Sequence, residues 1–396
     1  MGDEHEGRRR GVGRGAAVSG VTGEELPQAA VFEEAVEGGQ WILGPQVAAL
    51  EAQLAQFAGV KHAVACANGT DALLLILRAW NIGPGDAVFV PSFTFAATAE
   101  VVSLAGASPV FVDVLEDTFN MDPASLQTAI ELVRGDGKLK PRAVIPVDLF
   151  GQPADYRKLE PIVRREKLLM LVDTAQAFGA TLDGKQTAAT GDAAATSFFP
   201  AKPLGCYGDG GAIVTDDAAL VEVLKSLRVH GQHGTDKYDN VRIGLTSRLD
   251  TIQAAVLIEK LKIFQDEIAA RNRVADRYAG ALKDVCIVPV VPEGLTSVWA
   301  QYTIRLKPGM RIALAAVAAE MLPADTIYVD ETITHMPQIA GLADNHVVVE
   351  KVEEKYGLTR AQIMFTFSHN HCGPRLGDDL IDYYPVDEEQ MKLVEE

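Results

Sequence analysis

One lysine of this sequence stands where its amine could do chemistry. Lys202 follows the apolar run Ser197-Phe-Phe-Pro-Ala and opens a glycine-rich stretch that ends at Gly211. Desolvation in such a setting lowers the pKa of a lysine amine, and a neutral amine can form a Schiff base with an aldehyde cofactor. From these residues alone, a lysine on an exposed surface loop is an equally good interpretation.

A second segment could bind a phosphate group. Asn68, Gly69 and Thr70 lie between a predicted strand at 63–67 and a predicted helix at 71–80. The backbone N–H groups of Gly69 and Thr70 would then point outward at the positive end of the helix dipole, where anions bind. An ordinary helix cap formed by Asn68 or Thr70 explains the same residues.

Two further side chains follow the ends of predicted strands. Asp173 comes directly after a strand at 169–172, and open α/β sheets bind ligands outside the carboxyl ends of their strands. An aspartate there can keep a pyridine nitrogen protonated, and Gln176 could reach the phenolic oxygen of the same ring. Phe95, after a strand at 87–90, could stack on a planar ring. Taken singly, Asp173 could instead cap a following helix and Phe95 could belong to the core.

The elements that position these residues alternate between helix and strand. The expected helices span 47–57, 71–80, 96–105, 123–133 and 156–166, and the strands span 63–67, 87–90, 109–112, 143–147 and 169–172. Further strands at 196–199 and 211–215 precede a long amphipathic helix at 251–282. The alternation predicts an α/β fold with a mostly parallel sheet and helices on both faces.

We expect three regions along the chain: a disordered tail at 1–25, a large domain at 26–283 and a smaller α/β domain at 284–396. In the last region, strands are expected at 302–306, 326–329 and 363–367, and helices at 311–321 and 346–356. His369 and His371 could both face a metal ion, but two ligands do not complete a zinc site. We therefore expect no metal.

Composition narrows the function classes. The 396 residues include 54 acidic and 36 basic side chains, a net charge of −18, which disfavours nucleic acid or an anionic membrane as the main partner. The four cysteines are widely spaced, and no apolar stretch is long enough to span a bilayer. These features, with no secretory signal, predict a cytoplasmic protein with reduced thiols.

The order of these segments resembles the DegT/DnrJ/EryC1/StrS family of pyridoxal-phosphate-dependent nucleotide-sugar aminotransferases, which have the fold type I architecture with a seven-stranded sheet. The resemblance covers about 38–306, and residues 307–396 depart from it. The matching segments are Trp41-Ile-Leu-Gly-Pro45, Asn68-Gly-Thr-Asp-Ala-Leu73, Pro91-Ser-Phe-Thr-Phe95, Asp173-Thr-Ala-Gln176, Ser197-Phe-Phe-Pro-Ala-Lys202, Gly208-Asp-Gly-Gly211, Arg228-Val-His-Gly-Gln232 and Ser247-Arg-Leu-Asp-Thr-Ile-Gln-Ala-Ala255.

The resemblance implies roles for four residues around the cofactor ring. Lys202 would be the Schiff-base lysine and the proton shuttle. Asp173 would be the partner of the pyridine nitrogen, and Gln176 the partner of the phenolic oxygen. Phe95 would stack on the ring.

The resemblance also implies how the cofactor phosphate is held and that the enzyme is a homodimer. Gly69 and Thr70 through their backbone, with the Ser197 hydroxyl, would bind the phosphate. A loop of the neighbouring subunit, here 237–248, would complete the site. Thr246 stands where the family usually has asparagine, and a hydroxyl offers one donor where an amide offers two. Weaker cofactor binding would follow, unless a nearby residue such as Asn240 substitutes.

The implied reaction moves an amino group from an amino acid such as glutamate to a keto group of a nucleotide-linked sugar, in the biosynthesis of polysaccharides and related glycans. The sequence leans toward UDP-linked 3-keto or 4-keto sugars. Two alternatives stay open. A sugar dehydratase of the same family typically has histidine in place of the lysine, so Lys202 counts against it. A catalytically inactive regulatory homologue would explain Thr246 and the departure after residue 306.

Overall fold

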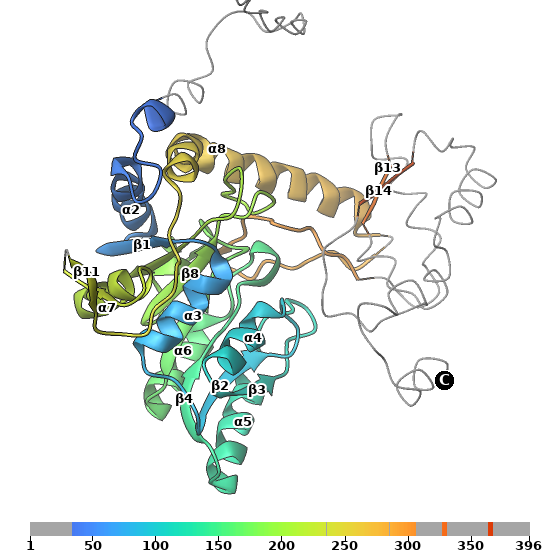
Figure 1. Cartoon of the computed structure of the whole chain (residues 1–396). Coiled ribbons are helices and arrows are strands. Elements are labelled where there is room, and N and C mark those ends of the chain that lie inside the picture. Colours follow the sequence, from blue (N-terminus) through green and yellow to red (C-terminus); the bar gives the residue numbers. More distant parts are fainter. Residues whose placement is uncertain (1–33, 235, 285, 306–326, 331–362, 367–396) are drawn as a thin grey trace, which may run out of the picture.

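A seven-stranded sheet forms the centre of the molecule. The computed structural model describes residues 34–234, 236–284, 286–305, 327–330 and 363–366 (Figure 1). The strand order is β1-β9-β8-β5-β4-β2-β3. The strands are β1 (His62–Cys66), β2 (Asp86–Pro91), β3 (Ser108–Val112), β4 (Lys140–Val144), β5 (Leu169–Asp173), β8 (Ala193–Ser197) and β9 (Gly211–Thr215). The tail expected at 1–25 lies outside the described residues.

Five neighbouring strands of the sheet run in one direction. β3, β2, β4, β5 and β8 pair in parallel, which confirms the mostly parallel sheet predicted from the alternation of elements. β9 is antiparallel to both of its neighbours, β8 and β1. β1 therefore points the same way as the parallel strands, and its carboxyl end lies at the same edge of the sheet.

Helices cover both faces of the sheet, as the sequence predicts. One face carries α3 (Gly69–Ala79), α4 (Ala97–Leu104) and α7 (Ala218–Leu227), and the other carries α2 (Pro45–Ala58), α5 (Pro123–Asp136), α6 (Tyr156–Glu166) and α8 (Thr251–Leu282). Alternate residues of β1 enter the two cores, Ala63 and Ala65 on one side and Val64 and Cys66 on the other. The long α8 packs against α2 (Figure 1).

Smaller elements connect and flank these layers. They are η1 (Leu149–Gly151), η2 (Thr187–Ala189), a three-stranded sheet of β12 (Leu295–Thr296), β6 (Thr181–Leu182) and β7 (Lys185–Gln186), a hairpin of β10 (Gln232–His233) and β11 (Asp236–Asn240), and a parallel pair of β13 (Ile327–Asp330) and β14 (Ile363–Thr366). The last pair corresponds to the strands expected at 326–329 and 363–367. The helices expected at 311–321 and 346–356 lie outside the described residues.

Several elements differ from the sequence prediction. β8 begins three residues and ends two residues earlier than the strand expected at 196–199. β4 begins and ends three residues earlier than the expected 143–147, because the apolar run reports burial whereas pairing with β2 starts at Lys140. The strand expected at 302–306 is only an isolated bridge between Arg305 and Ile287 in the described part of the chain. α7 was not expected, although Asp217 caps it by accepting the N–H groups of its first turn.

Side chains satisfy the open edge of β1. The Ala65 N–H donates to Glu51 Oε1 at 2.9 Å, and the Ala65 carbonyl accepts from Arg228 Nη1 at 2.7 Å. The same Arg228 nitrogen forms an ion pair with Glu51, and Arg228 is buried. Unpaired backbone groups on an edge strand would otherwise invite another strand. Glu51 and Arg228 therefore satisfy both backbone groups of Ala65 on this edge.

Removing this arginine should be costly. We expect Arg228→Ala to lower the free energy of unfolding by about 3–5 kcal/mol, because it leaves the Glu51 carboxylate without its charged partner and the Ala65 carbonyl without a donor. Urea unfolding measures the change. Arg164→Ala, which breaks a more exposed ion pair with Asp192, is the matched control and should cost about 1 kcal/mol or less. We call the contacts of Arg228 with Glu51 and the Ala65 carbonyl the Arg228 brace. Equal losses of unfolding free energy in the two variants would show that this brace stabilises the fold no more than an exposed ion pair does.

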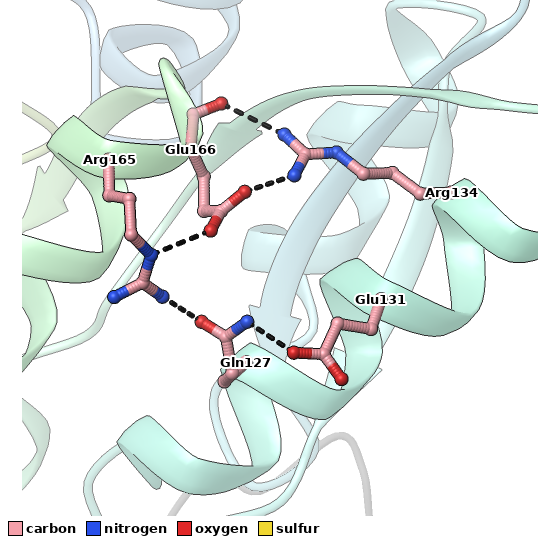
Figure 2. A network of polar contacts seen from close by, with 5 residues as sticks. All are labelled: Gln127, Glu131, Arg134, Arg165 and Glu166. Atoms are coloured by element: carbon pink, nitrogen blue, oxygen red, sulfur yellow. Dashed lines mark hydrogen bonds and ion pairs between the residues drawn. The ribbon is translucent and has the colours of Figure 1, made fainter.

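A polar network joins α5 to the carboxyl-terminal end of α6 (Figure 2). Arg134 pairs with the Glu166 carboxylate and donates to the Glu166 carbonyl at 3.2 Å. Arg165 donates to Glu166 at 2.9 Å and also to Gln127, which in turn donates to Glu131. Because most of these side chains are exposed, each pair stabilises the fold only weakly.

The helices and the cysteines of the described residues bear on two expectations, that the chain has no membrane span and that its thiols are reduced. None of the helices in the described ranges is both long and apolar enough to cross a membrane. Cys66, Cys206 and Cys286 are free and buried, in agreement with the expected thiols, and Cys372 lies outside the described residues.

Candidate active site

Three of the predicted site segments meet at one edge of the central sheet. β1 ends at Cys66, just before Asn68, while β5 ends at Asp173 and β8 ends at Ser197. These three strands point the same way, so their carboxyl ends lie at the same edge. In open α/β sheets this edge is where ligands bind.

The turn after β1 combines a helix cap with two backbone donors. α3 begins at Gly69, and the side chain of Asn68 caps it by accepting the Asp71 N–H at 2.7 Å. The capping interpretation is therefore correct for Asn68. In the part of the chain that the structure describes, the N–H groups of Gly69 and Thr70 have no acceptor. A Cβ on Gly69 would lie 2.7 Å from the Cβ of Ser197, so the turn and the end of β8 are in direct contact.

Gly69 should tolerate no side chain. We expect Gly69→Ala to weaken binding of the phosphate-bearing cofactor that the resemblance implies roughly 10- to 100-fold, because relieving the overlap with Ser197 costs about 1–3 kcal/mol and moves the two donors. Titration of the apoprotein, followed by visible absorbance, measures the dissociation constant. Gly280→Ala in α8 is the control, since a Cβ there meets nothing within 4 Å. Unchanged binding by Gly69→Ala would exclude this turn as the phosphate site.

Asp173 is a buried carboxylate at the end of β5. Its Oδ1 accepts the Ala175 N–H at 3.0 Å, and its Oδ2 accepts the Thr98 hydroxyl at 3.5 Å. Burial raises the pKa of Asp173, while the Ala175 N–H, the positive charge of Lys202 and the Thr98 hydroxyl oppose that rise. A carboxylate that is destabilised in this way favours a cationic partner.

Lys202 lies in the loop between β8 and β9, and backbone contacts hold that loop tightly. The Phe198 N–H donates to the Gly210 carbonyl at 2.7 Å, and the Lys202 N–H donates to the Phe199 carbonyl at 2.8 Å. Gly205 is required by close packing, because a Cβ would lie 2.5 Å from the carbonyl oxygen of Pro200. Gly205 and Gly210, two glycines of the stretch that ends at Gly211, thus shape the loop that carries Lys202.

The environment of Lys202 favours its neutral form. Burial lowers the pKa of the Lys202 amine, and the negative charge of Asp173 opposes that change. The two groups therefore interact electrostatically across the site. A lysine with a lowered pKa has a larger fraction of free amine at neutral pH, which is the form that acts as a nucleophile or a base.

Gln176 is oriented by the backbone of a neighbouring segment. Its Oε1 accepts the Phe150 N–H at 2.6 Å. Because an N–H donor must face the amide oxygen, this bond also fixes which end of the side chain is the nitrogen. The amide Nε2 remains as a donor for another group.

Phe95 precedes α4 and has 47% of its surface exposed. Its carbonyl accepts the Thr98 N–H at 3.1 Å, and Thr98 is the residue whose hydroxyl reaches Asp173. Phe95 therefore lies at the same edge of the sheet as the other predicted site residues.

Thr246 lies in the loop that, by the resemblance, would reach into the site of a neighbouring subunit. Within its own chain the Thr246 hydroxyl bonds to Nε2 of His230 at 2.5 Å. Asn240, the expected substitute, donates to the His230 carbonyl at 3.0 Å. The adjacent Ser247 accepts the Ala67 N–H at 3.3 Å, so this segment touches the turn between β1 and α3.

Sequence reasoning missed one buried carboxylate, Asp148. It accepts three hydrogen bonds, from the Ala154 N–H at 2.8 Å, the Tyr156 hydroxyl at 2.6 Å and the Thr187 hydroxyl at 2.8 Å. Burial raises the pKa of Asp148 to about 7, with the nearby Asp173 adding to the rise and the three hydrogen bonds opposing it. The signal was present, because Asp148 directly follows the strand expected at 143–147.

This raised pKa predicts a pH-dependent stability. The folded protein holds a proton on Asp148 that the unfolded chain releases near pH 4, so the favourable contribution is full below about pH 4 and is lost as the pH rises to about 7. Tyr156 and Asp173 are the titratable groups that face it. Relative to the wild type, Asp148→Asn should therefore gain stability over this range, by a few kcal/mol at about 1.4 kcal/mol per pKa unit. Urea unfolding at several pH values measures this, and parallel pH profiles of the two proteins would contradict it.

No metal centre accompanies these residues. Within the described ranges, no group of three or more His, Cys, Asp or Glu side chains could hold a metal ion. His369 and His371 lie outside those ranges, so the expectation for them stays a prediction.

The fold and the interaction of Lys202 with Asp173 place the molecule among α/β enzymes that bind a ligand at the carboxyl edge of their sheet. The chain belongs to the DegT/DnrJ/EryC1/StrS aminotransferase family, whose sequence profile matches residues 24–347. It is thus an aminotransferase. The match extends on both sides of the 38–306 span that the sequence motifs indicated.

Relatives of known activity and known structure agree with this assignment. The chain is 46% identical over 276 residues to the UDP-2-acetamido-2-deoxy-3-oxo-D-glucuronate aminotransferase of Pseudomonas aeruginosa, covering 69% of this chain and 74% of that protein. It is 54% identical to a DegT/DnrJ/EryC1/StrS aminotransferase from Brucella abortus, whose crystal structure matches with a TM-score of 0.71 over 75% of this chain and 79% of that one.

Pyridoxal phosphate is the cofactor. A putative sugar aminotransferase from Streptococcus pneumoniae, solved in its PLP form, is 26% identical, with a TM-score of 0.67 over 74% of this chain and 79% of that one. The residues at this edge fit the group. They are two N–H groups at the start of α3 without an acceptor among the residues that the structure describes, a buried carboxylate that favours a cation, and a lysine with a lowered pKa.

Proposed function

We propose that this enzyme aminates the keto group of a UDP-linked 3-keto sugar, with glutamate as the amino donor. The observation that carries the proposal is the similarity to the Pseudomonas aeruginosa enzyme, whose name specifies a UDP-linked 3-oxo sugar. The interaction of Lys202 with Asp173 at the carboxyl edge of the sheet supports the aminotransferase chemistry. The product, an amino sugar, would serve the assembly of polysaccharides.

Lys202 is the residue that moves the proton. When bound, pyridoxal phosphate supplies an aldehyde carbon and an electron-accepting ring. In the glutamate half-reaction, Lys202 Nζ, whose pKa is lowered by burial, would take the proton from the α-carbon of the amino donor and pass it to the former aldehyde carbon of the cofactor. In the sugar half-reaction it would move a proton in the opposite sense, from that carbon to the sugar carbon that receives the amino group. The same neutral amine is the group that would anchor the aldehyde.

Two polar side chains set the charge around the ring. Asp173 would face the pyridine nitrogen and favour its protonated form, which in turn relieves the cost of burying this carboxylate. Gln176 would donate through Nε2 to the phenolic oxygen, since its Oε1 is already used by the Phe150 N–H.

The remaining predicted residues would hold the rest of the cofactor. The N–H groups of Gly69 and Thr70 lie at the amino terminus of α3, where the helix dipole favours a phosphate, and Ser197 lies against Gly69. Phe95 would stack on the ring from the start of α4.

A second copy of the chain would complete the site. Large apolar side chains are exposed near the segment that the resemblance assigns to the partner, including Trp41 (60%), Tyr238 (80%) and Ile243 (88%). Such surfaces usually belong to an interface. In a homodimer, Thr246 would reach the cofactor phosphate of the other subunit. Its hydroxyl would then give up its bond to His230 and donate to that phosphate. A monomer that binds the cofactor tightly in light scattering would contradict this arrangement.

The division of the chain also stays a proposal. α8 ends at Leu282, which agrees with a large domain at 26–283 and a smaller one at 284–396. Limited proteolysis near residue 284 should release a stable large fragment that lacks the smaller domain. Cleavage spread evenly over 200–396 would contradict the boundary.

The test of the reaction follows the visible spectrum through its two halves. Adding glutamate to the cofactor-loaded protein should convert the visible band to the pyridoxamine form, and adding a UDP-linked 3-keto sugar should restore it. A matched dTDP-linked 4-keto sugar should restore it at least ten times more slowly. A band that ignores all amino donors would favour the dehydratase or the regulatory interpretation, and equal rates with the two sugars would overturn the proposed substrate.

A further inference from the structure

A short elbow behind the candidate active site, η1 (Leu149–Gly151), determines where Gln176 points. Phe150 in this elbow donates its N–H to Gln176 Oε1 at 2.6 Å. Its backbone has φ of 62°, a left-handed conformation that a bulky residue adopts only when its surroundings enforce it. Something must therefore hold the elbow in place.

Asn120 fixes the elbow from one side. Its Oδ1 accepts the Leu149 N–H at 3.1 Å, and its Nδ2 donates to the carbonyls of Gln152 and Pro153 at 3.0 Å each. Asn120 is buried. One side chain thus ties both ends of the elbow together.

Asp148 fixes the elbow from the other side. Its Oδ1 accepts the Ala154 N–H and the Tyr156 hydroxyl, and its Oδ2 accepts the Thr187 hydroxyl. Its own N–H donates to the carbonyl of Asp173 at 3.0 Å. Asp148, which directly precedes the elbow, is therefore bonded to α6, to η2 and to the backbone of β5 at Asp173.

The elbow is also in contact with the segment that leads away from α8. The Gly151 carbonyl accepts the Val298 N–H at 2.9 Å and the Ser297 hydroxyl at 3.0 Å. A Cβ on Gly151 would lie 2.7 Å from the backbone nitrogen of Ala300, and Gly151 has φ of 97°, so only glycine fits. The elbow is thus held by Asn120, by Asp148 and by the segment at 297–300, and its Phe150 N–H is bonded to Gln176.

We propose that Asp148 is a positioning residue for the cofactor: together with Asn120 it holds the Phe150 N–H in the place that orients the Gln176 amide. This rests on the proposed function in one respect only, the contact of Gln176 Nε2 with the cofactor ring. The orientation of Gln176 itself is a property of the protein alone. Asp148 touches neither the cofactor nor the substrate and acts through the elbow.

The first measurement needs no cofactor. In Asp148→Ala, three donors lose their acceptor, the elbow relaxes, and amide hydrogen exchange at Phe150 in the apoprotein should accelerate at least about tenfold, as it should in Gln176→Ala. Asp148→Asn should keep slow exchange, because its Oδ1 still accepts two donors and its Nδ2 can donate to Thr187. Arg228→Ala is the control for general destabilisation, and its Phe150 amide should stay protected.

The second measurement uses the loaded protein. The pH midpoint of the visible cofactor band should shift in Asp148→Ala in the same direction as in Gln176→Ala, and the double variant should shift no further than Gln176→Ala alone. Additive shifts, or a protected Phe150 amide in Asp148→Ala, would overturn the proposal. A wild-type protein with no visible band would refute the proposed function, whereas the exchange experiment would still decide the role of Asp148.

Discussion

Replacing Lys202 by alanine should reduce the rate of amino transfer from glutamate by at least about 10³-fold, because proton transfer by a positioned side chain contributes roughly 10²–10⁴-fold and the anchoring amine is lost as well. The buried setting that lowers the pKa of this amine is what suits it to the task. Single-turnover absorbance after mixing the loaded protein with glutamate measures the rate.

The controls separate chemistry from folding. Lys158→Ala removes an exposed lysine that pairs with Asp155 on the surface of α6, and it should transfer the amino group at the wild-type rate. Lys202→Arg keeps the positive charge and about the same length, but arginine stays protonated at neutral pH, so its rate should be as low as that of Lys202→Ala. Wild-type rates in either Lys202 variant would remove this residue from the mechanism.

Asp173→Asn should lower the same rate by about 10²–10³-fold, the usual effect of removing one preorganised electrostatic partner. Asparagine has nearly the same shape and can still accept the Ala175 N–H, but it carries no charge to favour a protonated ring nitrogen. Burial raises the pKa of Asp173, so the charged form is costly in the apoprotein. The variant should therefore be as stable as the wild type, or more stable, while losing activity.

The decisive observation would be that Asp173→Asn keeps or gains free energy of unfolding while its rate of amino transfer from glutamate falls. It is measured by urea unfolding of the apoprotein beside the glutamate half-reaction of the loaded protein. A variant that loses both would indicate that Asp173 serves the structure of the turn. Thr98→Val, which removes the long hydroxyl contact to Asp173 and the 3.0 Å bond to the Thr94 hydroxyl but leaves the carboxylate in place, is a matched control and should change the rate by less than about tenfold.

The sheet and most of its helices could be predicted from the sequence because burial imposes a visible period. α6 and α8 begin and end where the apolar spacing places them, and β9 is a short apolar run with turns on both sides. The predicted bounds of β4 were three residues too late, because the strand begins at Lys140, where its residues pair with β2 without being fully buried. Local pattern reports burial, whereas hydrogen bonding between strands depends on neighbours distant in the sequence.

In the candidate active site, too, some residues could be predicted from the local sequence pattern and others depend on contacts with distant segments. Residues at strand ends, such as Asp173 and Ser197, could be found from their position alone. The orientation of Gln176 could not, because it depends on the backbone of Phe150, twenty-six residues away. Nor could the place of Thr246 at His230, which follows from how two loops meet. Asp148 is the instructive case, since its sequence signal equals that of Asp173 and only its three buried partners reveal what it does.

The position of β9 has a consequence for how the protein is made. β9 separates β1 from β8, yet it leaves the ribosome about 150 residues after β1. At roughly 5–20 residues per second, the nascent chain carries β1 without its neighbour for roughly 7 to 30 s. During that time neither the Arg228 brace nor the contact between Gly69 and Ser197 exists. The cofactor can therefore join only after β9 and Arg228 have left the ribosome, and β1 is the segment that a chaperone would have to shield until then.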